Sequence, residues 1–395
     1  MTVAGPGAAA VAAGWLRRAL LVAVALAFGG LYYRLFAAPA LGGFVPPQAI
    51  PRAAPSTAPL YRPQLLPNSA ERSVHSATAV EISGGRLRAF WYGGSREGAA
   101  DVAIYTSVYS PVEGTWSPEH AVVTRESAQR HLQRYLRKLG NPVVGRDRDG
   151  RLWLFFVSVT IGGWGGSAIN LMVSEDEGET WSVPRRLIAS PFFNISTLVR
   201  GAPFLFTDGT IGLPVYHEMV GKFGELLRLD AGGHAIRKTR LSWGRTSLQP
   251  VIVPRSETEA VGFMRYAGDP PKRVLMVRTA DGGATWTPPV KTALPNPDAA
   301  VGSVLLANGP LLLALNHAEE NRESLSLASS TDFGKTWRIA HEFEGESSSP
   351  QPLMREFSYP WIMQDGAGDV HLLYTWGRTR IKHVHFNPAW LADRR

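Results

Sequence analysis

From about residue 71 onward, the hydrophobic positions fall in short runs of four to six residues, separated by turns rich in glycine, aspartate or asparagine. Runs of this length between turn residues are typical of β-strands. A helical period is scarce, and its best example covers residues 128–139, where we expect one helical insertion. The pattern therefore predicts an all-β body of many short strands. The clearest runs are Ala77–Ile82, Leu87–Trp91, Leu152–Val157, Ile211–Val215, Val274–Val277, Leu311–Leu315 and Val370–Tyr374.

One octapeptide recurs three times among these strands. The copies begin at Ser174, Thr279 and Ser330, and all fit [Ser/Thr]-x-Asp-x-Gly-x-Thr-Trp. Their Asp residues lie 105 and 51 residues apart, which predicts units of 51 residues with one copy missing between the first two. A degenerate fourth copy, Val112–Trp116, precedes them. About 320 residues from Glu71 to the end then give six units of about four strands each, a six-bladed β-propeller.

The octapeptide has the composition of a tight structural turn. Its Asp can accept hydrogen bonds from backbone N–H groups of its own turn, and its Gly permits a positive φ. Its Trp offers a large apolar surface to neighbouring strands. None of these roles is catalytic, so we expect them to serve the fold. The residues concerned are Asp176, Trp181, Asp281, Trp286, Asp332 and Trp337.

Composition narrows the class of protein. The 395 residues carry 41 Lys and Arg against 33 Asp and Glu, and the net charge of +8 suits an anionic partner. No Lys/Arg-rich run of the kind that binds nucleic acid is present, so we predict no nucleic-acid partner. Cysteine is absent, which excludes disulfides and thiol chemistry. The ten histidines are scattered, with only His383 and His385 close together, and we predict no metal and no cofactor.

The N-terminus carries a membrane signal. Residues 19–33 form an uncharged, mostly apolar run after Arg17 and Arg18, and residues 35–40 can extend it. The arginine pair predicts a single-pass anchor in the cell membrane, with the propeller in the periplasm or extracellular space. A cleavable signal peptide is the alternative, but Arg34 directly after the apolar run favours the anchor. The predicted organisation is a cytoplasmic N-terminus and signal anchor over 1–38, a proline-rich linker over 39–70 and the propeller over 71–395.

Short polar motifs recur where each predicted blade begins. In a propeller the first strand of each blade lines the central channel, so we expect these motifs to converge on one axial pocket. Because Asn141 lies in one of these motifs, we predict that it binds substrate. The motifs are residues 74–76, 140–142, 200–203, 248–250, 296–298 and 357–360.

The three octapeptides match the Asp-box, and over about residues 72–392 the chain resembles the sialidase superfamily, specifically its BNR-repeat, sialidase-like members. The resemblance implies a six-bladed propeller acting on terminal acidic sugars of a glycan. Sialidases hold the substrate carboxylate with three arginines. They also use an Asp as acid/base and a Tyr nucleophile assisted by a Glu.

Part of this set carries over residue by residue. Arg265 and Arg322, each one strand before an Asp-box, resemble two of the carboxylate-binding arginines. Arginine suits this role because its planar fork pairs with a carboxylate through two hydrogen bonds. Arg96 resembles an additional pocket arginine, and the acid is Glu97 or Asp101.

The remaining positions depart from the sialidase pattern. His75 stands where the first-blade arginine is expected, and Gln249 stands in place of the assisting Glu. Phe357 aligns with the nucleophile, while Tyr359 lies two residues further on the same strand face. A Gln cannot act as a base and a Phe cannot attack a sugar, so the resemblance implies an altered catalytic set.

Further polar side chains end apolar strands and are candidates for the rim of the pocket. Glu218 is a candidate second carboxylate for hydrolysis with a water nucleophile. The others are candidates for substrate binding: Tyr216, His217, Asn316, His317 and Arg378.

Three hypotheses follow. The first is a sialidase-like glycoside hydrolase acting on an acidic glycan, with Arg265 and Arg322 binding the carboxylate. The second is a polysaccharide lyase on uronate-containing chains, in which His75 or His217 works with Tyr216 or Tyr359. The third is a glycan-binding propeller without catalysis.

Overall fold

The computed structural model describes residues 6–37, 41–49, 53, 56–68, 72–190, 194–307, 309–345 and 356–392. The chain divides into two units, Met1–Leu41 and Gly42–Arg395. The described part of the first unit is one helix, α1 (Pro6–Ala37). Its window Ala13–Gly30 is long and apolar enough to cross a membrane, a property that an N-terminal signal sequence shares.

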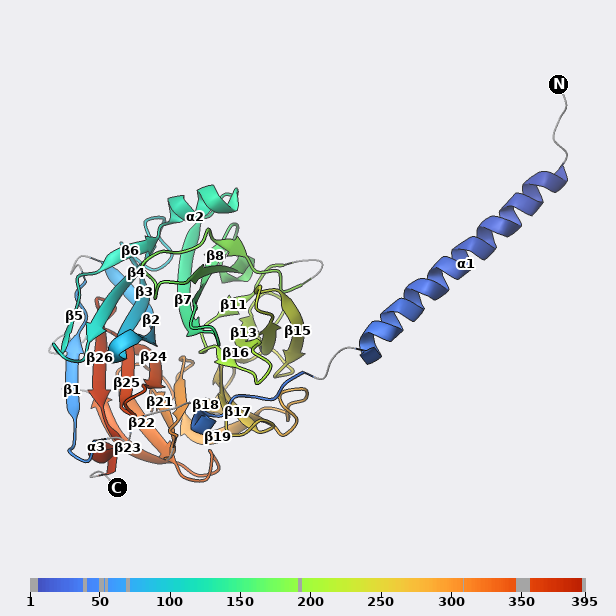
Figure 1. The fold of residues 1–395 in the computed structure, drawn as a ribbon. Helices are drawn as coiled ribbons and strands as arrows, with labels where there is room; N and C mark the ends of the chain where they lie inside the picture. The colour runs from blue at the N-terminus through green and yellow to red at the C-terminus, as the bar shows by residue number, and fades with distance from the viewer. Residues whose placement is uncertain are drawn as a thin grey trace. The chain divides into compact units, whose positions relative to one another are not determined.

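The second unit is a six-bladed β-propeller, as predicted. The described strands form six antiparallel sheets around a central axis, and each sheet is one blade (Figure 1). Blade 1 is β2 (Ser73–Ile82), β3 (Arg86–Gly94), β4 (Ala103–Ser110), β5 (Thr115–Trp116) and β6 (His120–Val123); blade 2 is β7 (Lys138–Arg146), β8 (Leu152–Val159), β9 (Ser167–Ser174) and β10 (Arg185–Arg186); blade 3 is β11 (Leu198–Val199), β12 (Phe204–Leu205), β13 (Ile211–His217), β14 (Phe223–Leu229) and β15 (Ala235–Arg240); blade 4 is β16 (Ser247–Pro254), β17 (Ala260–Tyr266), β18 (Arg273–Thr279) and β19 (Val290–Pro295); blade 5 is β20 (Gly302–Leu305), β21 (Leu311–Leu315), β22 (Leu325–Ser330) and β23 (Arg338–Glu344); blade 6 is β24 (Phe357–Gln364), β25 (Val370–Trp376), β26 (Arg380–Phe386) and β1 (Tyr61–Leu65).

Blade 6 joins the two ends of the propeller chain. Its outer strand is β1, which pairs antiparallel with β26 from Tyr61 opposite Phe386 to Leu65 opposite Lys382. The proline pattern assigned this segment to a linker over 39–70. The strand tolerates Pro63 because it lies at the sheet edge, where a missing N–H costs no ladder bond. The same range contributes Phe44, which is fully buried within the second unit.

The helical insertion is shorter than the sequence pattern suggests. Helix α2 (Arg125–Leu132) lies between blades 1 and 2, and residues from Lys138 belong to β7. Thr124 caps its start, because the Thr124 side chain accepts from the Ser127 N–H and the Ser127 hydroxyl oxygen accepts from the Thr124 N–H. Gln133 ends it in the left-handed conformation. The other short helices are η1 (Pro47–Ala49), η2 (Ser83–Gly85), η3 (Trp164–Gly166) and α3 (Pro388–Ala392).

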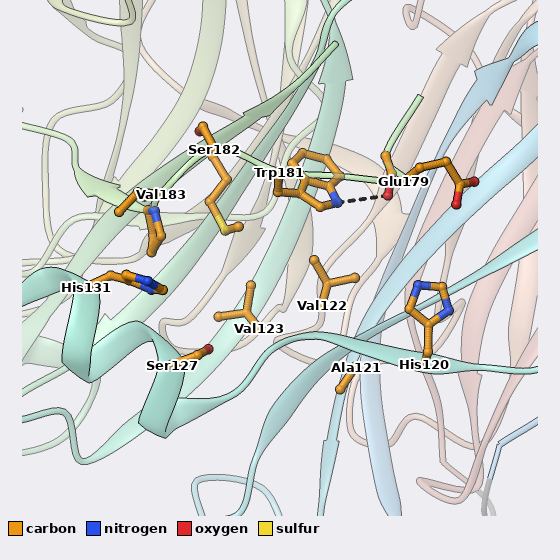
Figure 2. Close-up of a pocket in the computed structure, with 13 residues that line it drawn as sticks. His120, Ala121, Val122, Val123, Ser127, His131, Glu179, Trp181, Ser182 and Val183 are labelled. Carbon is orange, nitrogen blue, oxygen red and sulfur yellow. Dashed lines mark hydrogen bonds between the residues drawn. The ribbon is translucent and has the colours of Figure 1, made fainter. Parts of the chain in front are cut away.

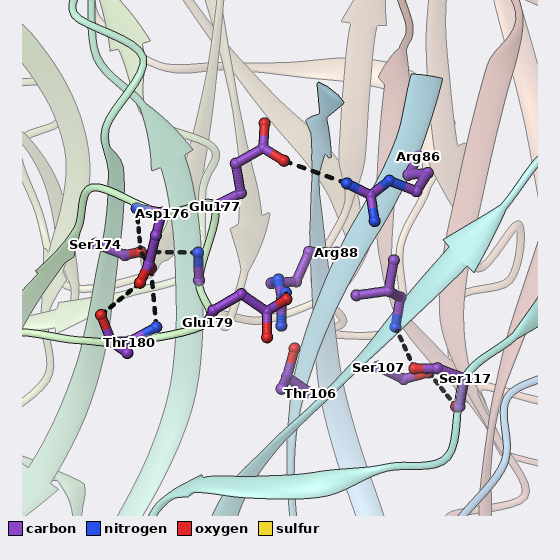
Figure 3. Close-up of polar contacts among 12 residues, drawn as sticks. Arg86, Arg88, Thr106, Ser107, Ser117, Ser174, Asp176, Glu177, Glu179 and Thr180 are labelled. Carbon is purple, nitrogen blue, oxygen red and sulfur yellow. Dashed lines mark hydrogen bonds and ion pairs between the residues drawn. The ribbon is translucent and has the colours of Figure 1, made fainter. Parts of the chain in front are cut away.

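The Asp-boxes are closed structural turns between the third and fourth strands of blades 2, 4 and 5. In the first box, Asp176 Oδ1 accepts from the Thr180 N–H at 2.8 Å and Asp176 Oδ2 from the Thr180 hydroxyl at 2.5 Å (Figure 3). The Ser174 hydroxyl donates to Asp176 and accepts from the Gly178 N–H, and Gly178 has φ 93°. These bonds, led by those from Thr180, lower the pKa of Asp176 to about 2. The box charge is therefore satisfied within its own turn.

Candidate active site

Six residues with positive φ, one at the inner start of each blade, shape the centre of the propeller. The strand register shifts at four of them, for example between His75 and Thr78 in β2 and between Ser358 and Trp361 in β24. A left-handed conformation costs a non-glycine residue about 1–3 kcal/mol and is usually found at functional sites. The six are Ser76, Asn141, Ser196, Gln249, Asp298 and Tyr359. Five of them belong to the polar motifs found in the sequence; in blade 3 the residue is Ser196 rather than one of residues 200–203.

Asn141, Gln249 and Tyr359 contribute side chains to a polar cavity of about 220 Å³ at this end of the inner strands. We call it the axial cavity. Its lining comes from strands of blades 1, 2, 3, 4 and 6 and from loops that join strands within blades 1, 2, 3, 5 and 6. The lining residues are His75, Glu97, Asn141, Trp164, Tyr216, Glu218, Gln249, Arg265, Arg322, Tyr359 and Arg378.

Three arginines line the axial cavity, and two acidic residues behind them hold them in place. Arg265 Nε donates to the Asp298 carboxylate, while Arg322 Nη2 donates to the Asp298 carbonyl at 2.8 Å. Arg378 Nε donates to Glu356 Oε2 at 2.7 Å, and Arg322 Nη1 to Glu356 Oε1 at 3.3 Å. A guanidinium has five N–H donors and these contacts use only some of them. The arginines are therefore oriented by the protein and still able to bind an anion.

A network of hydrogen bonds centred on Gln249 and Tyr216 joins residues that line the cavity. The Gln249 amide donates to the Tyr359 hydroxyl at 3.0 Å and to the Tyr216 hydroxyl at 3.4 Å. Asn141 also donates to Tyr216, at 3.2 Å, and Arg265 Nη1 donates to Gln249 Oε1 at 3.3 Å. Burial raises the pKa of Tyr216 well above its usual value, so this phenol keeps its proton. Gln249 thus fixes the position of Tyr359 without being able to take its proton.

His75 is a neutral imidazole against Tyr359. Their ring centroids lie 4.1 Å apart, and His75 is 2% exposed. Burial, and then the charges of Arg378 and Arg322, hold the pKa of His75 well below its usual value. Its Nδ1 is buried and has no hydrogen-bond partner among the described residues. The ring of His75 therefore stays uncharged beside the arginines, and its lowered pKa makes it a weak base.

Glu218 differs from the other carboxylates around the cavity. Burial raises the pKa of Glu218 above its usual value, although the charge of Arg265 acts in the opposite direction. Glu97, in contrast, is ion-paired with Arg378 Nη1 at 2.6 Å. A carboxyl group with a raised pKa is suited to donate a proton, so Glu218 is the better placed acid.

The axial cavity contains ten of the fifteen residues that the sequence nominated for catalysis or substrate binding. Two that lie elsewhere belong to the loop after β3. Arg96 is exposed, and Asp101 accepts from the Ser95 N–H at 2.9 Å and from the Ser95 hydroxyl at 3.0 Å. These bonds lower the pKa of Asp101 even though burial opposes them. Asp101 thus holds its own loop and does not line the cavity.

The other three lie at strand ends outside the cavity lining. His217 stacks on Phe223 with centroids 4.9 Å apart. Asn316 is buried and donates to the carbonyls of Ser324 and Phe357, at 2.5 and 2.6 Å. His317 is exposed. Phe357, which aligns with the sialidase nucleophile, is fully buried, and the residue of β24 that lines the cavity is Tyr359.

Sequence reasoning missed the residues that support the cavity from behind. Glu356 and Asp298 orient the arginines, and Arg200 Nη2 donates to the carbonyls of Tyr359 at 2.7 Å and Pro360 at 2.9 Å. Asp298 and Arg200 belong to the polar motifs at the blade starts, residues 296–298 and 200–203. Membership in these motifs was the sequence feature that could have identified them. Glu356 had no such feature, because its role depends on arginines 34 and 22 residues away. Trp164, in a glycine-rich loop, also lines the cavity.

A second cavity, of about 380 Å³, lies at the propeller rim between β6, α2 and the first Asp-box (Figure 2). His120 and His131 line it together with Trp181, whose indole N–H donates to the Gly178 carbonyl at 3.0 Å. None of the described residues that line this rim cavity is an arginine or a lysine. Among the described residues, one group of three side chains could share a metal ion, and it lies in blade 6 and not in either cavity.

The propeller with an arginine-lined axial cavity defines a protein of the sialidase-like class. Residues 85–372 match the family model of the BNR repeat-like domain, and the chain belongs to this family. No curated protein matches the sequence.

Solved structures share the fold at low sequence identity. A protein of unknown function from Dyadobacter fermentans matches with a TM-score of 0.65 and 14% identity, over 83% of this chain and 99% of its own. The NanB sialidase of Streptococcus pneumoniae matches with a TM-score of 0.63 and 10% identity, over 82% and 70%. An α-L-arabinanase of Penicillium chrysogenum, complexed with arabinobiose, matches with a TM-score of 0.59 and 15% identity. The match covers 84% of this chain and 99% of the arabinanase chain. These likenesses concern the fold.

Proposed function

We propose that the protein is a sialidase-like glycoside hydrolase that acts on a terminal acidic sugar of a glycan, with the axial cavity as its active site. The observation that carries the proposal is the convergence of Arg265, Arg322 and Arg378 on one cavity that also holds a tyrosine and a carboxyl group with a raised pKa. Glycosidases among the proteins of similar fold support a glycan as the substrate.

The three arginines would bind the sugar carboxylate. Arg378 would take the role of the first-blade arginine that His75 replaces, because both residues line the cavity and, in addition to burial, the charge of Arg378 lowers the pKa of His75. Trp164 would stack on the sugar face, and Lys138, whose Nζ lies 3.7 Å from the Trp164 ring centroid, would fix the indole. The cavity then recognises charge on one side and an apolar ring face on the other.

Hydrolysis would proceed with Glu218 as the general acid. Glu218 gives its proton to the glycosidic oxygen as the bond to the anomeric carbon breaks, and water adds its hydroxyl group to that carbon. The remaining proton of the water returns to the Glu218 carboxylate. Tyr359, held by Gln249, would place its electron-rich oxygen beside the developing positive charge on the sugar.

A uronate lyase is the second candidate, favoured by the contact between His75 and Tyr359. The arginines would neutralise the uronate carboxylate, and the neutral ring of His75, which lines the cavity, would take the proton from the adjacent carbon. Tyr359 would then protonate the leaving oxygen as the double bond forms. Gln249, which replaces a base, is compatible with this use of Tyr359 as an acid.

Mass spectrometry of the products separates these reactions. The full-length chain is incubated with sialosides and with uronate-containing oligosaccharides. Products whose masses sum to the substrate plus one water support hydrolysis, and products that sum to the substrate mass support elimination. Binding without turnover overturns both and leaves a glycan-binding propeller.

We also propose that α1 anchors the protein in the cell membrane with the propeller on the exported side. The apolar window in α1 and the arginine pair Arg17–Arg18 support this topology. Protease accessibility of the propeller in intact cells tests it, and a mature protein that lacks residues before about 41 would contradict the anchor in favour of a signal peptide.

A further inference from the structure

Three of the ten histidines lie together on one face of blade 6, far along the sequence from most of the axial-cavity residues. His371 on β25 stands directly opposite His385 on β26, and their rings stack with centroids 4.3 Å apart. His383, two residues from His385, lies 5.2 Å from His371. All three are buried. Three buried imidazoles in contact are an uncommon use of core space, since each brings polar nitrogens that need partners.

Two carboxylates complete this group. Asp365 Oδ2 lies 2.9 Å from His371 Nε2, and Asp369 Oδ2 lies 2.9 Å from His385 Nε2. Both aspartates come from the turn between β24 and β25. The side chains of Asp365, His371 and His385 each offer a ligand atom, and these atoms lie within 4.8 Å of one another.

We propose that Asp365, His371 and His385 bind a divalent transition-metal ion, with zinc as the best fit and Asp369 as the fourth ligand. Imidazole nitrogen and carboxylate oxygen are zinc ligands, at about 2.0–2.2 Å from the ion. Two such atoms on one tetrahedral zinc lie about 3.3–3.5 Å apart, so side-chain shifts of less than about 1.5 Å would bring the ligand atoms of Asp365, His371 and His385 to that separation. Magnesium and calcium prefer sets made of oxygen alone.

The second nitrogen of each histidine ligand has a partner, as is usual in metal sites. His371 Nδ1 lies 2.9 Å from His383 Nε2, and His385 Nδ1 lies 3.4 Å from the Tyr109 hydroxyl. His383 Nδ1 continues the chain to the Gln64 amide at 3.3 Å. These contacts fix the ring orientation that directs both Nε2 atoms towards the aspartates.

The location gives the ion a structural role. Gln64 belongs to β1, the strand that closes the ring, and Tyr109 belongs to β4 of blade 1. The proposed site and its partners therefore connect blade 6, the closing strand and blade 1. Zinc would stabilise the closed ring, independently of the reaction proposed for the axial cavity.

The same contacts also satisfy a chain of hydrogen bonds without metal, and zinc content distinguishes the two. The full-length protein is stripped with a chelator, dialysed against Zn²⁺ and measured by inductively coupled plasma mass spectrometry. We expect one zinc per chain and, at zinc about a hundredfold above Kd, a Tm rise of about 5 °C. Less than a tenth of an equivalent with an unchanged Tm would overturn the proposal.

Variants assign the ligands. Asp365→Asn keeps the Oδ1 acceptor for the Asp369 N–H but removes the charge, and His385→Gln removes a ring nitrogen. Each should lose zinc and the zinc-dependent Tm rise. The control His234→Gln alters an exposed histidine that pairs with Asp230, and should retain one zinc. Zinc retained by both ligand variants would overturn the assignment.

A spectroscopic measurement covers the case in which the buried variants do not fold. Co²⁺ added to the stripped wild-type chain should give the intense visible absorption of a four-coordinate nitrogen and oxygen site, and one equivalent of Zn²⁺ should abolish it. Absorption of hexaaqua Co²⁺ alone would contradict the site.

Discussion

The Asp-box turns and the axial cavity use the same kind of charged side chain in opposite ways. In each box the aspartate is satisfied by the turn that contains it, as in Asp281, which accepts from the N–H and hydroxyl of Thr285 and from Thr279. In the cavity, each arginine takes its partners from other parts of the chain and keeps free N–H donors. Arg322, for example, binds Asp298 and Glu356.

This difference distinguishes the repeated structural turns from the side chains proposed to bind substrate. A charge satisfied by its neighbours in sequence can be repeated in every blade and adds stability locally. A charge that is only partly satisfied, and held by distant residues, is costly to the fold and useful for binding. The comparison predicts that cavity substitutions lower activity without lowering stability, and that box substitutions do the reverse.

The largest effect should come from Glu218→Gln. Removal of a general acid lowers kcat by about 10²–10⁴-fold. The isosteric amide should leave Tm unchanged, since the buried carboxyl already resists ionisation. Burial raises the pKa of Glu218, so wild-type activity should fall on the alkaline side at a pH above the usual Glu range, and the variant should lose that limb. Steady-state rates across pH, with Tm measured on the same samples, check this. A variant with wild-type kcat removes Glu218 from the mechanism.

Arg322→Ala should weaken substrate binding by about 100-fold, because a hydrogen bond to a charged group is worth about 1.5–3 kcal/mol. Isothermal titration with the acidic glycan measures this, and a neutral glycan of the same length should show a smaller change. Arg245→Ala, at an exposed position, is the control and should leave the affinity unchanged. Equal losses of affinity for the acidic and the neutral glycan would mean that Arg322 does not recognise the negative charge of the glycan.

Asp281→Ala should lower Tm by about 2–4 °C, because three hydrogen bonds that close the turn are lost. The fall in Tm should be no larger, because the Asp281 carboxylate is exposed to solvent and interactions of exposed charges contribute little to stability. The affinity for substrate should not change. The exposed Asp269→Ala in the preceding loop serves as the matched control, with no expected shift in Tm. A loss of activity at unchanged Tm would break the separation between boxes and cavity.

The smallest effect is a pH dependence of stability. Hydrogen bonds from Thr285 and Thr279 lower the pKa of Asp281 to about 2 even though burial opposes them, and the pKa of Asp176 is also about 2. A carboxyl group whose folded pKa is depressed stabilises the protein above its unfolded pKa of about 3.8, and that stability is lost as the pH falls towards 2. Calorimetry between pH 5 and 2 should show Tm falling in this window, less steeply for Asp281→Asn. Equal slopes for the two proteins would contradict a role for the box charge.

The sequence by itself determined the architecture, because its information is local and repeated. The octapeptide carries its own acceptor, its own positive-φ glycine and its own tryptophan. Three copies, separated by 105 and 51 residues, therefore define the turn and, with the chain length, the number of blades. The blade-start motifs were also readable, since short polar segments such as residues 248–250 interrupt apolar runs. These features depend on neighbours a few residues away, and such contacts are visible along the chain.

Only the tertiary structure decided which polar residues form a site. It brought Arg378 to the axial cavity beside Arg322, with Glu356 bridging them, and it directed Asp101 into its own loop. It also converted part of the proline-rich segment into β1 and brought His371, His383 and His385 together in blade 6. These outcomes depend on residues far apart in sequence, and burial and partner distance fix the charge of a side chain only after the ring has closed.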